Sequence, residues 1–178
     1  MAMREWLERP LALTSTLTAA TAVSGSLATD PRSTWYQALD KPRWKPAGWV
    51  FPLVWMALYS SIAVASAKVI EDLEAEGASS SADRYRKALV VNLVLNQGWS
   101  WVFFKAHRLG PATALAGLLA ASSWDLARRA GQTGSSGVFA LAPYAVWCSF
   151  ATVLTGEIRR RNRPGVRPPA PAPVAPRG

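Results

Sequence analysis

The sequence predicts an all-α membrane protein, built as a bundle of five transmembrane helices. Half of the 178 residues are hydrophobic, and nine are tryptophan. Charged residues almost entirely avoid five stretches, each about as long as the 17–25 residues that a helix needs to cross a bilayer. A soluble helix of this length would show a polar stripe with a period of 3.6 residues, whereas these stretches have Ser and Thr but no charged face. The predicted spans are residues 11–29, 48–67, 87–104, 111–127 and 137–158.

The first span is the least apolar of the five, because it contains LTSTLTAAT. A threonine hydroxyl can bond to a backbone carbonyl one turn earlier, so these residues are tolerated in lipid. The stretch follows Arg4 and Arg9 and ends near Ala28, which leaves a cleaved signal peptide as an alternative interpretation.

A segment rich in aromatic residues and proline joins the first two spans. The sequence from Trp35 to Trp55 reads WYQALDKPRWKPAGWVFPLVW and contains three prolines. It is too rich in proline for a helix or a central strand, so we expect a stiff segment at the membrane interface. Two interpretations remain: an interfacial aromatic belt, or a lid over the bundle.

Helical spacing places aromatic side chains on one face of three spans. Such stripes are more often packing residues than ligand contacts, and an asparagine in mid-span can equally be a hydrogen-bonding contact between helices. A proline inside the fifth span is expected to kink it. The faces comprise Phe51, Trp55 and Tyr59; Asn96, Trp99 and Phe103; and Pro143, Trp147, Ala151 and Leu154.

The fourth span is rich in Ala, Gly and Ser. Small residues four apart, such as Gly117 and Ala121, allow two helices to approach closely. The sequence does not distinguish packing within the bundle from a dimer interface.

The net charge of +9 is interpreted through its placement along the chain. With five spans, Lys and Arg are most numerous on the side that holds residues 30–47 and the C-terminal segment. The positive-inside rule then places the C-terminus in the cytoplasm. Residues 163–178, rich in Pro and Arg, are predicted to be a disordered tail. Nucleic-acid binding is not expected, and a bacterial cell membrane is the expected location.

Several kinds of site are excluded or disfavoured. A single Cys and a single His leave no intramolecular disulfide and no His/Cys metal cluster. Cys148 is expected to be an inert packing residue, and His107 a solvated residue at the interface. We therefore predict no catalytic and no metal-binding residues.

Two acidic residues lie at span ends. Asp125 and Glu157 are close in sequence to Arg128 and Arg159. Pairing with these arginines is favoured over a role in proton transfer.

Ordered motifs across about residues 10–162 resemble the TspO/translocator protein family, which includes the tryptophan-rich sensory proteins and the peripheral benzodiazepine receptor. They comprise Trp35, Tyr36, Leu39, Lys41, Pro42, Trp44 and Pro46; Trp49, Val50, Phe51, Pro52, Val54, Trp55, Leu58 and Tyr59; Asn96, Trp99, Val102, Phe103 and Phe104; and Pro143, Tyr144, Trp147, Phe150, Ala151 and Leu154. The chain departs from the family pattern at Ala47, where a second Pro is usual, and at Thr155, where Asn is usual. It also lacks the Tyr of the animal cholesterol motif, so cholesterol recognition is not expected.

The resemblance implies a five-helix bundle, often homodimeric, with a pocket that the 35–49 loop closes. Its ligands would be porphyrins or heme-like tetrapyrroles, with no required cofactor. A flat aromatic ligand suits stacking, and Lys41, Arg43 or Lys45 could meet its carboxylates. The implied ligand-binding residues are Trp35, Tyr36, Trp44, Phe51, Trp55, Tyr59, Asn96, Trp99, Trp147, Ala151 and Leu154.

Three functions remain open from the sequence. The first is a membrane receptor or carrier that binds tetrapyrroles. The second is a light-dependent, porphyrin-degrading enzyme, which would need only tryptophans beside an excited ligand. The third is a structural or regulatory membrane protein with an incidental pocket. A coupled pump is disfavoured because the sequence has no nucleotide loop and no driving-ion site.

Overall fold

The computed structural model describes residues 9–133 and 135–163. The described residues form α-helices and no strand, which confirms the all-α prediction. The tail predicted to be disordered lies outside the described residues, apart from Arg163. The helices are α2 (Pro10–Ala28), α3 (Thr34–Ala38), α4 (Val50–Ala75), α5 (Ser79–Ser100), α6 (Leu109–Gly131) and α7 (Ser135–Arg161), and a π-helix, η1 (Trp101–Lys105), continues α5.

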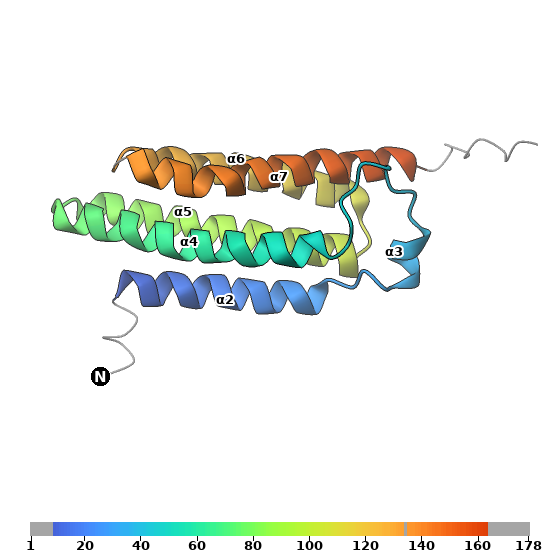
Figure 1. Ribbon diagram of the computed structural model, residues 1–178, viewed down its shortest axis with the longest axis horizontal. Helices are drawn as coiled ribbons and strands as arrows, with labels where there is room; N and C mark the ends of the chain where they lie inside the picture. The colour runs from blue at the N-terminus through green and yellow to red at the C-terminus, as the bar shows by residue number, and fades with distance from the viewer. Residues whose placement is uncertain (1–8, 134, 164–178) are drawn as a thin grey trace, which may run out of the picture.

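The long helices run side by side along the longest axis of the molecule (Figure 1). Helix α2 packs against α4 and α5, while α6 packs against α5 and α7. The short helix α3 and the rest of the connector between α2 and α4, residues 29–49, lie at one end of the bundle (Figure 1). This segment is called the connector below.

Three of the described helices are long and apolar enough to cross a membrane: α2, α4 and the Gly137–Arg161 part of α7. Helix α5 begins with four charged residues between positions 83 and 87, and α6 ends with three between positions 125 and 129. These charges shorten the apolar part of both helices. Composition therefore supports a multi-pass membrane protein with three clear spans among the described helices, and the predicted number of five is not confirmed.

The helices do not end where the apolar stretches end. Helix α4 continues to Ala75, eight residues beyond the boundary predicted at 67. Four of the eight added residues are charged, and Lys68 pairs with Asp72 at the helical i,i+4 spacing, at 2.5 Å. Between them, Val69 and Ile70 are buried in the core. Hydropathy alone misses this extension because its charges lower the average.

The expectation of a non-helical connector is wrong at its first end. Thr34–Ala38 is helical, and Ser33 caps it by accepting a hydrogen bond from the backbone N–H of Tyr36. At the other end α4 begins at Val50, close to the span boundary predicted at 48, and Pro52 lies in its first turn. Proline is tolerated there because the first N–H groups of a helix have no intrahelical acceptor.

Helix α2 is bonded into the bundle. The Thr14 hydroxyl donates to the backbone carbonyl of Ala63 in α4 at 2.8 Å. On the other side, the Gln97 side chain of α5 donates to Ser24 at 2.6 Å. Thr18 donates to the carbonyl of Thr14, four residues earlier, as predicted for threonines in this helix. These contacts favour a structural role for the segment in the folded protein.

A buried chain of hydrogen bonds joins α4, α5, α6 and α7. The Tyr59 hydroxyl donates to Asn96 Oδ1 at 2.9 Å, and Asn96 Nδ2 donates to the Tyr144 hydroxyl at 3.3 Å. The Tyr144 hydroxyl in turn donates to Asn92 Oδ1 at 2.8 Å, and Asn92 Nδ2 donates to Ser123 at 3.1 Å. We call these five residues the polar network. Because each group needs its partner, the network fixes how the four helices are rotated about their axes.

The small residues of α6 lie in different environments. A Cβ atom on Gly117 would contact the Thr152 side chain of α7 at 3.9 Å, so this glycine faces the inside of the bundle. Ala121 is exposed. Gly117 therefore belongs to internal packing, which settles for this residue the alternative that the sequence left open.

The polar network predicts a specific loss of stability. We expect Asn92→Ala to lower the free energy of unfolding by about 1–2 kcal/mol, because the Tyr144 hydroxyl loses its acceptor in a buried site. Thermal unfolding in detergent, followed by circular dichroism, measures the change. Val91→Ala at the neighbouring exposed position is the matched control, and equal melting temperatures for the two variants would contradict the prediction.

Candidate ligand-binding site

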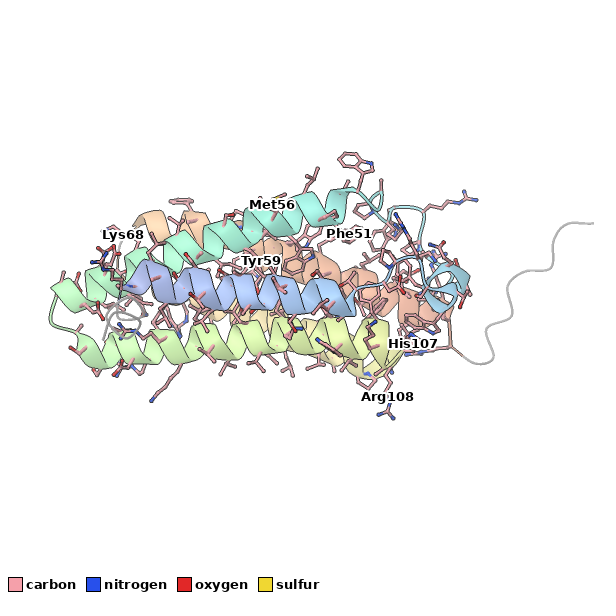
Figure 2. The ribbon with its side chains drawn as sticks, turned by 90° about the horizontal axis from the view of Figure 1, so that it is seen from below. Phe51, Met56, Tyr59, Lys68, His107 and Arg108 are labelled. Carbon is pink, nitrogen blue, oxygen red and sulfur yellow. The ribbon has the colours of Figure 1, made fainter. Side chains whose placement is uncertain are left out.

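An aromatic layer lies between the connector and the ends of the long helices. It packs on buried Ala112, Leu154 and Ile158. Figure 2 shows Phe51 and His107 at this end of the molecule and Lys68 toward the opposite end. The rings of the layer belong to Trp35, Tyr36, Phe51, Trp99, Phe103, Phe104 and Phe150.

The rings of the aromatic layer contact one another in the arrangements that aromatic pairs prefer. Trp99 stacks on Phe103 with centroids 5.5 Å apart, and Trp35 meets Phe103 edge-on at 5.6 Å. Tyr36 lies 5.5 Å from Phe104. The connector thus covers the end of α5 with two of its own rings.

The π-helix at the end of α5 shapes this contact. Its first residue, Trp101, accepts a hydrogen bond from the N–H of Ala106, five residues later, at 3.0 Å. Within the π-helix, the consecutive residues Phe103 and Phe104 both reach Tyr36 of the connector. π-helical turns are frequent at functional sites, and no pattern in the sequence indicated this one.

His107 ends this turn in a left-handed conformation, with φ of +55°. This conformation costs a residue other than glycine roughly 1–2 kcal/mol. The imidazole ring stacks on Trp35 with centroids 4.1 Å apart and planes 12° apart, which offsets part of that cost. The side chain is exposed, as expected, but sequence reasoning missed its contact with the connector.

A second group of rings continues from the aromatic layer into the middle of the bundle. Phe51 meets Trp147 edge-on at 5.8 Å and so links the two groups. Deeper still, Trp55 stacks on Tyr59 at 5.3 Å and meets Tyr144 edge-on at 6.4 Å. The rings therefore extend from the connector to the polar network.

The structure distributes nine of the eleven predicted ligand-binding residues over these two groups, and Trp44 and Ala151 lie outside them. Trp44 is 49% exposed and meets Phe150 edge-on at 5.9 Å, so it lies at the outer rim. Ala151 is half-buried in α7. The aromatic layer and the residues packed with it include Trp35, Tyr36, Phe51, Trp99 and Leu154. The deeper group includes Trp55, Tyr59, Asn96 and Trp147.

Asn96 and Trp99 differ in how their polar groups are satisfied. Both ends of the Asn96 amide are bonded, to Tyr59 and Tyr144, so here the residue connects helices. Within the described residues, the indole nitrogen of Trp99 and Oε1 of Gln97 are buried without a hydrogen-bond partner. A buried polar group left unpaired costs about 1–3 kcal/mol. The Trp99 N–H is thus a free donor inside the aromatic layer.

Lys41 holds the connector together from within. Partial burial and the charge of Lys45 lower the pKa of Lys41, whereas Asp40 and the carbonyl oxygens around its ammonium favour the charged form. The ammonium also lies 4.8 Å from the centroid of the Tyr36 ring. Its Nζ donates to the carbonyls of Tyr36 at 2.6 Å, Leu39 at 2.8 Å and Gln37 at 3.2 Å.

The other connector cations differ in their contacts. Lys45 Nζ donates to the carbonyl of Pro46 at 2.8 Å and lies 5.6 Å from the Phe51 ring centroid. Arg43 is exposed. Of the three cations expected to meet ligand carboxylates, two are engaged with backbone carbonyls.

The connector is docked on the end of α7 by a reciprocal pair of hydrogen bonds. Asn162 Nδ2 donates to the backbone carbonyl of Asp40 at 2.9 Å, and the backbone N–H of Asp40 donates to Asn162 Oδ1 at 3.0 Å. The Asp40 carboxylate also lies 3.6 Å from the Arg161 guanidinium. Sequence reasoning missed this contact because 122 residues separate the partners.

The acidic residues at helix ends form ion pairs, with one correction. Asp125 pairs with Arg128 as expected and also with Arg129. Glu157 pairs with Arg160 and Arg161, not with Arg159, because residues two apart lie on different sides of a helix. The structure places no three potential metal ligands together within the residues that it describes.

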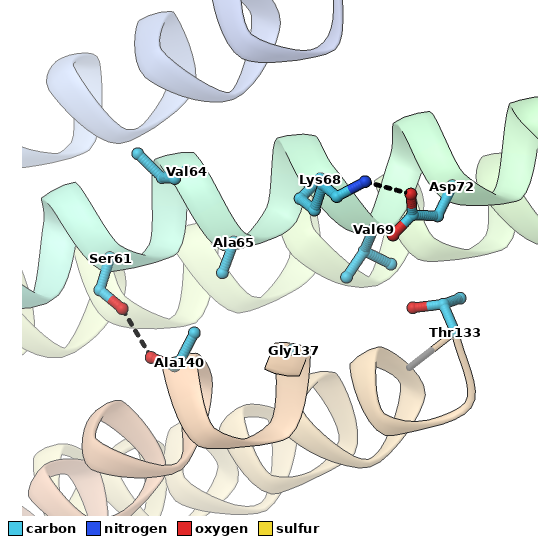
Figure 3. Close-up of a pocket in the computed structure, with 9 residues that line it drawn as sticks. All are labelled: Ser61, Val64, Ala65, Lys68, Val69, Asp72, Thr133, Gly137 and Ala140. Atoms are coloured by element: carbon cyan, nitrogen blue, oxygen red, sulfur yellow. Dashed lines mark hydrogen bonds and ion pairs between the residues drawn. The ribbon is translucent and has the colours of Figure 1, made fainter. Parts of the chain in front are cut away.

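A cavity of about 240 Å³ lies between α4 and α7, away from the connector (Figure 3). Lys68 and Asp72 pair at its edge, and the Ser61 hydroxyl donates to the carbonyl of Ala140 at 2.6 Å. None of the predicted ligand-binding residues lines it. It is therefore separate from the aromatic layer.

Comparison with known proteins identifies relatives of this chain. Residues 12–161 match the model of the TspO/MBR family. The chain is 33% identical to a tryptophan-rich sensory protein of Cereibacter sphaeroides, over 75% of this chain and 81% of the relative. It is also 33% identical to the tryptophan-rich protein TspO of Chlorobaculum tepidum, over 85% of this chain and 95% of the relative. Its identity to the human translocator protein is 34%, over 72% of this chain and 75% of the relative.

The hydrogen bonds that dock the connector are expected to slow its cleavage by proteases. Removing the two side-chain hydrogen bonds with Asn162→Ala should raise the population of the undocked connector about 5- to 30-fold, at roughly 1 kcal/mol per bond. Trypsin cleavage after Arg43 should accelerate accordingly, because the bonds after Lys41 and Lys45 precede proline and resist the enzyme. Arg163→Ala, one position further along, is the control. An unchanged cleavage rate in Asn162→Ala would show that these bonds do not hold the connector.

Proposed function

The chain belongs to the TspO/MBR family, and from this premise we propose that it binds a porphyrin or heme-like tetrapyrrole in the aromatic layer beneath the connector. It would act as a membrane receptor or carrier of that ligand. The proposal includes five spans, with α5 and α6 crossing the bilayer beside the three clear ones. Its relatives include a tryptophan-rich sensory protein and a translocator protein.

The observation that supports this proposal most directly is the unpaired indole N–H of Trp99. It lies among stacked rings, where a flat aromatic ligand would find both a stacking surface and a hydrogen-bond donor. A ligand acceptor bonded to this group would remove the cost of leaving it unpaired. Small-molecule pockets are usually mostly apolar, with a small number of polar groups.

Entry of a disc-shaped ligand requires the connector to move, because the rings are packed against one another. The hydrogen bonds between Asp40 and Asn162 form a small, solvent-exposed contact that can open without disturbing the polar network. Exposed Arg43 then supplies a cation for a propionate at the mouth, in place of Lys41. The connector is proposed to act as the lid.

The proposed orientation and assembly rest on charge and family membership. We propose that the C-terminus lies in the cytoplasm, because the arginines at 159–161 and 163 favour that side under the positive-inside rule. The proposed partners are the lipid bilayer, of a bacterial cell membrane, and a second copy of the chain in a homodimer. No nucleic acid is expected to bind.

A light-dependent, porphyrin-degrading activity is the second candidate. Trp99 and Trp147 would give an excited ligand two oxidisable indole rings, which pack on Phe103 and Phe51 respectively. Illumination of the bound porphyrin in air distinguishes the two functions. A discrete product that forms only with the folded protein supports degradation, and nonspecific bleaching favours the receptor or carrier.

The test uses protoporphyrin IX titrated in the dark into the purified protein, with binding followed by the porphyrin absorbance. Replacing Trp99 with benzothienylalanine keeps the bicyclic ring but substitutes sulfur for the N–H. We expect binding to weaken about three- to tenfold, the worth of one hydrogen bond, while the unliganded protein is at least as stable as the wild type.

The same replacement at Trp49, which is 68% exposed, is the control and should change neither quantity. Failure of the wild type to saturate would overturn the proposed function and favour a structural or regulatory role. Equal binding by the Trp99 analogue would show that the indole N–H does not bond to the ligand.

A further inference from the structure

A shallow groove of about 310 Å³ lies between α5 and α6, outside the site described above. Its α5 wall comprises Arg84, Lys87, Ala88 and Val91, spaced i, i+3, i+4 and i+7, so they share one helix face. Its α6 wall comprises Ser122, Asp125 and Arg129, also on one face. The function proposed above uses none of these residues.

The groove is charged at one end and apolar at the other. Arg84, Lys87, Asp125 and Arg129 lie where α5 begins and α6 ends, at the end of the bundle away from the connector. Toward the middle of the bundle the walls become small or apolar. This order matches a phospholipid, whose charged headgroup lies at the membrane interface and whose chains enter the hydrocarbon.

The charged end is positive, because its one carboxylate is already neutralised. Asp125 accepts from Arg129 at 2.5 Å and from Arg128 at 2.6 Å. Arg84 donates only to a neutral group in its own helix, Ser81, at 2.8 Å. Lys87 is exposed beside it. A phosphate between α5 and α6 would therefore meet two guanidinium groups and an ammonium.

An apolar surface continues the groove along the bundle. Val91 is 56% exposed and Val94, less than one turn further along α5, is 64% exposed. On α6, Leu118 lies one turn before Ser122 on the same face and is 57% exposed. These side chains provide a surface for acyl chains directly below the cations.

We propose that this groove is a binding site for an anionic phospholipid, with its phosphate held by Arg84, Lys87 and Arg129 and its chains lying on Val91, Val94 and Leu118. Basic pockets between transmembrane helices bind phospholipid headgroups on the cytoplasmic side of membranes. The same charges would act on a headgroup at the opposite membrane face, where the orientation proposed above puts this groove. The inference does not depend on the tetrapyrrole site.

Ser122 connects this groove to the interior of the protein. Its hydroxyl oxygen accepts a hydrogen bond from Asn92 Nδ2 at 3.2 Å, and Asn92 belongs to the polar network. The Ser122 hydroxyl hydrogen can be donated to a phosphate or ester oxygen in the groove. A bound lipid would then add one more bond to the contact between α5 and α6.

Native mass spectrometry of the purified protein with equimolar phosphatidylglycerol and phosphatidylcholine tests the proposal. The wild type should retain phosphatidylglycerol preferentially. Arg84→Gln combined with Lys87→Gln should reduce that retention on the order of 10- to 30-fold, since each cation near a membrane surface contributes a several-fold effect. The double variant Arg32→Gln, Lys105→Gln removes the same charge at the other end of the bundle and should bind like the wild type.

A photoactivatable phosphatidylglycerol gives a second measurement on the unaltered protein, independent of how the variants fold. Crosslinks should map to residues 84–94 and 118–129. Equal retention of both lipids by the wild type, crosslinks elsewhere, or displacement of the lipid by inorganic phosphate alone would each overturn the proposal. Burial of the groove between two copies of the chain in lipid-free, dimeric protein would also overturn it.

Discussion

The polar network is the interaction on which the rest of this structure depends. Five side chains, Tyr59, Asn96, Tyr144, Asn92 and Ser123, join four helices without a single charge. Between apolar helices in lipid, hydrophobic burial gives little preference for one rotation over another, because the lipid is as apolar as the side chains. Hydrogen bonds do give that preference, since each unmade bond leaves a buried polar group unpaired.

Fixing these rotations also fixes the position of the aromatic rings. Tyr59 follows Phe51 and Trp55 by whole helical turns, so the bond from Tyr59 to Asn96 turns all three rings toward α5 and α7. Asn96 likewise directs Trp99 toward the connector end. The bundle therefore supplies a rigid, uncharged floor, whereas the connector above it is attached by ring contacts and a few exposed hydrogen bonds. That difference in strength lets one end of the protein open while the remainder stays folded.

Sequence reasoning identified the helices and most of the rings but missed their partners. The helices were predictable from the apolar stretches, and the shared face of Phe51, Trp55 and Tyr59 from their i, i+4 spacing, because both features depend on local periodicity. The docking of Asp40 on Asn162 was not predictable, since nothing local pairs residues so distant in sequence. Asn92 was overlooked because it belongs to none of the quoted motifs. The π-helix before His107 was not predicted either, because its contacts with the connector are not encoded in intrinsic propensity.

Hydrogen–deuterium exchange of the wild-type protein in the dark, with and without protoporphyrin IX, reports where the ligand binds and whether the connector closes over it. If the ligand enters the aromatic layer and the connector closes on it, protection should increase in residues 33–47 and 99–108. Residues 61–72 and 137–140, around the cavity in Figure 3, should stay unchanged. Protection confined to that cavity, or no protection at saturating porphyrin, would contradict the account.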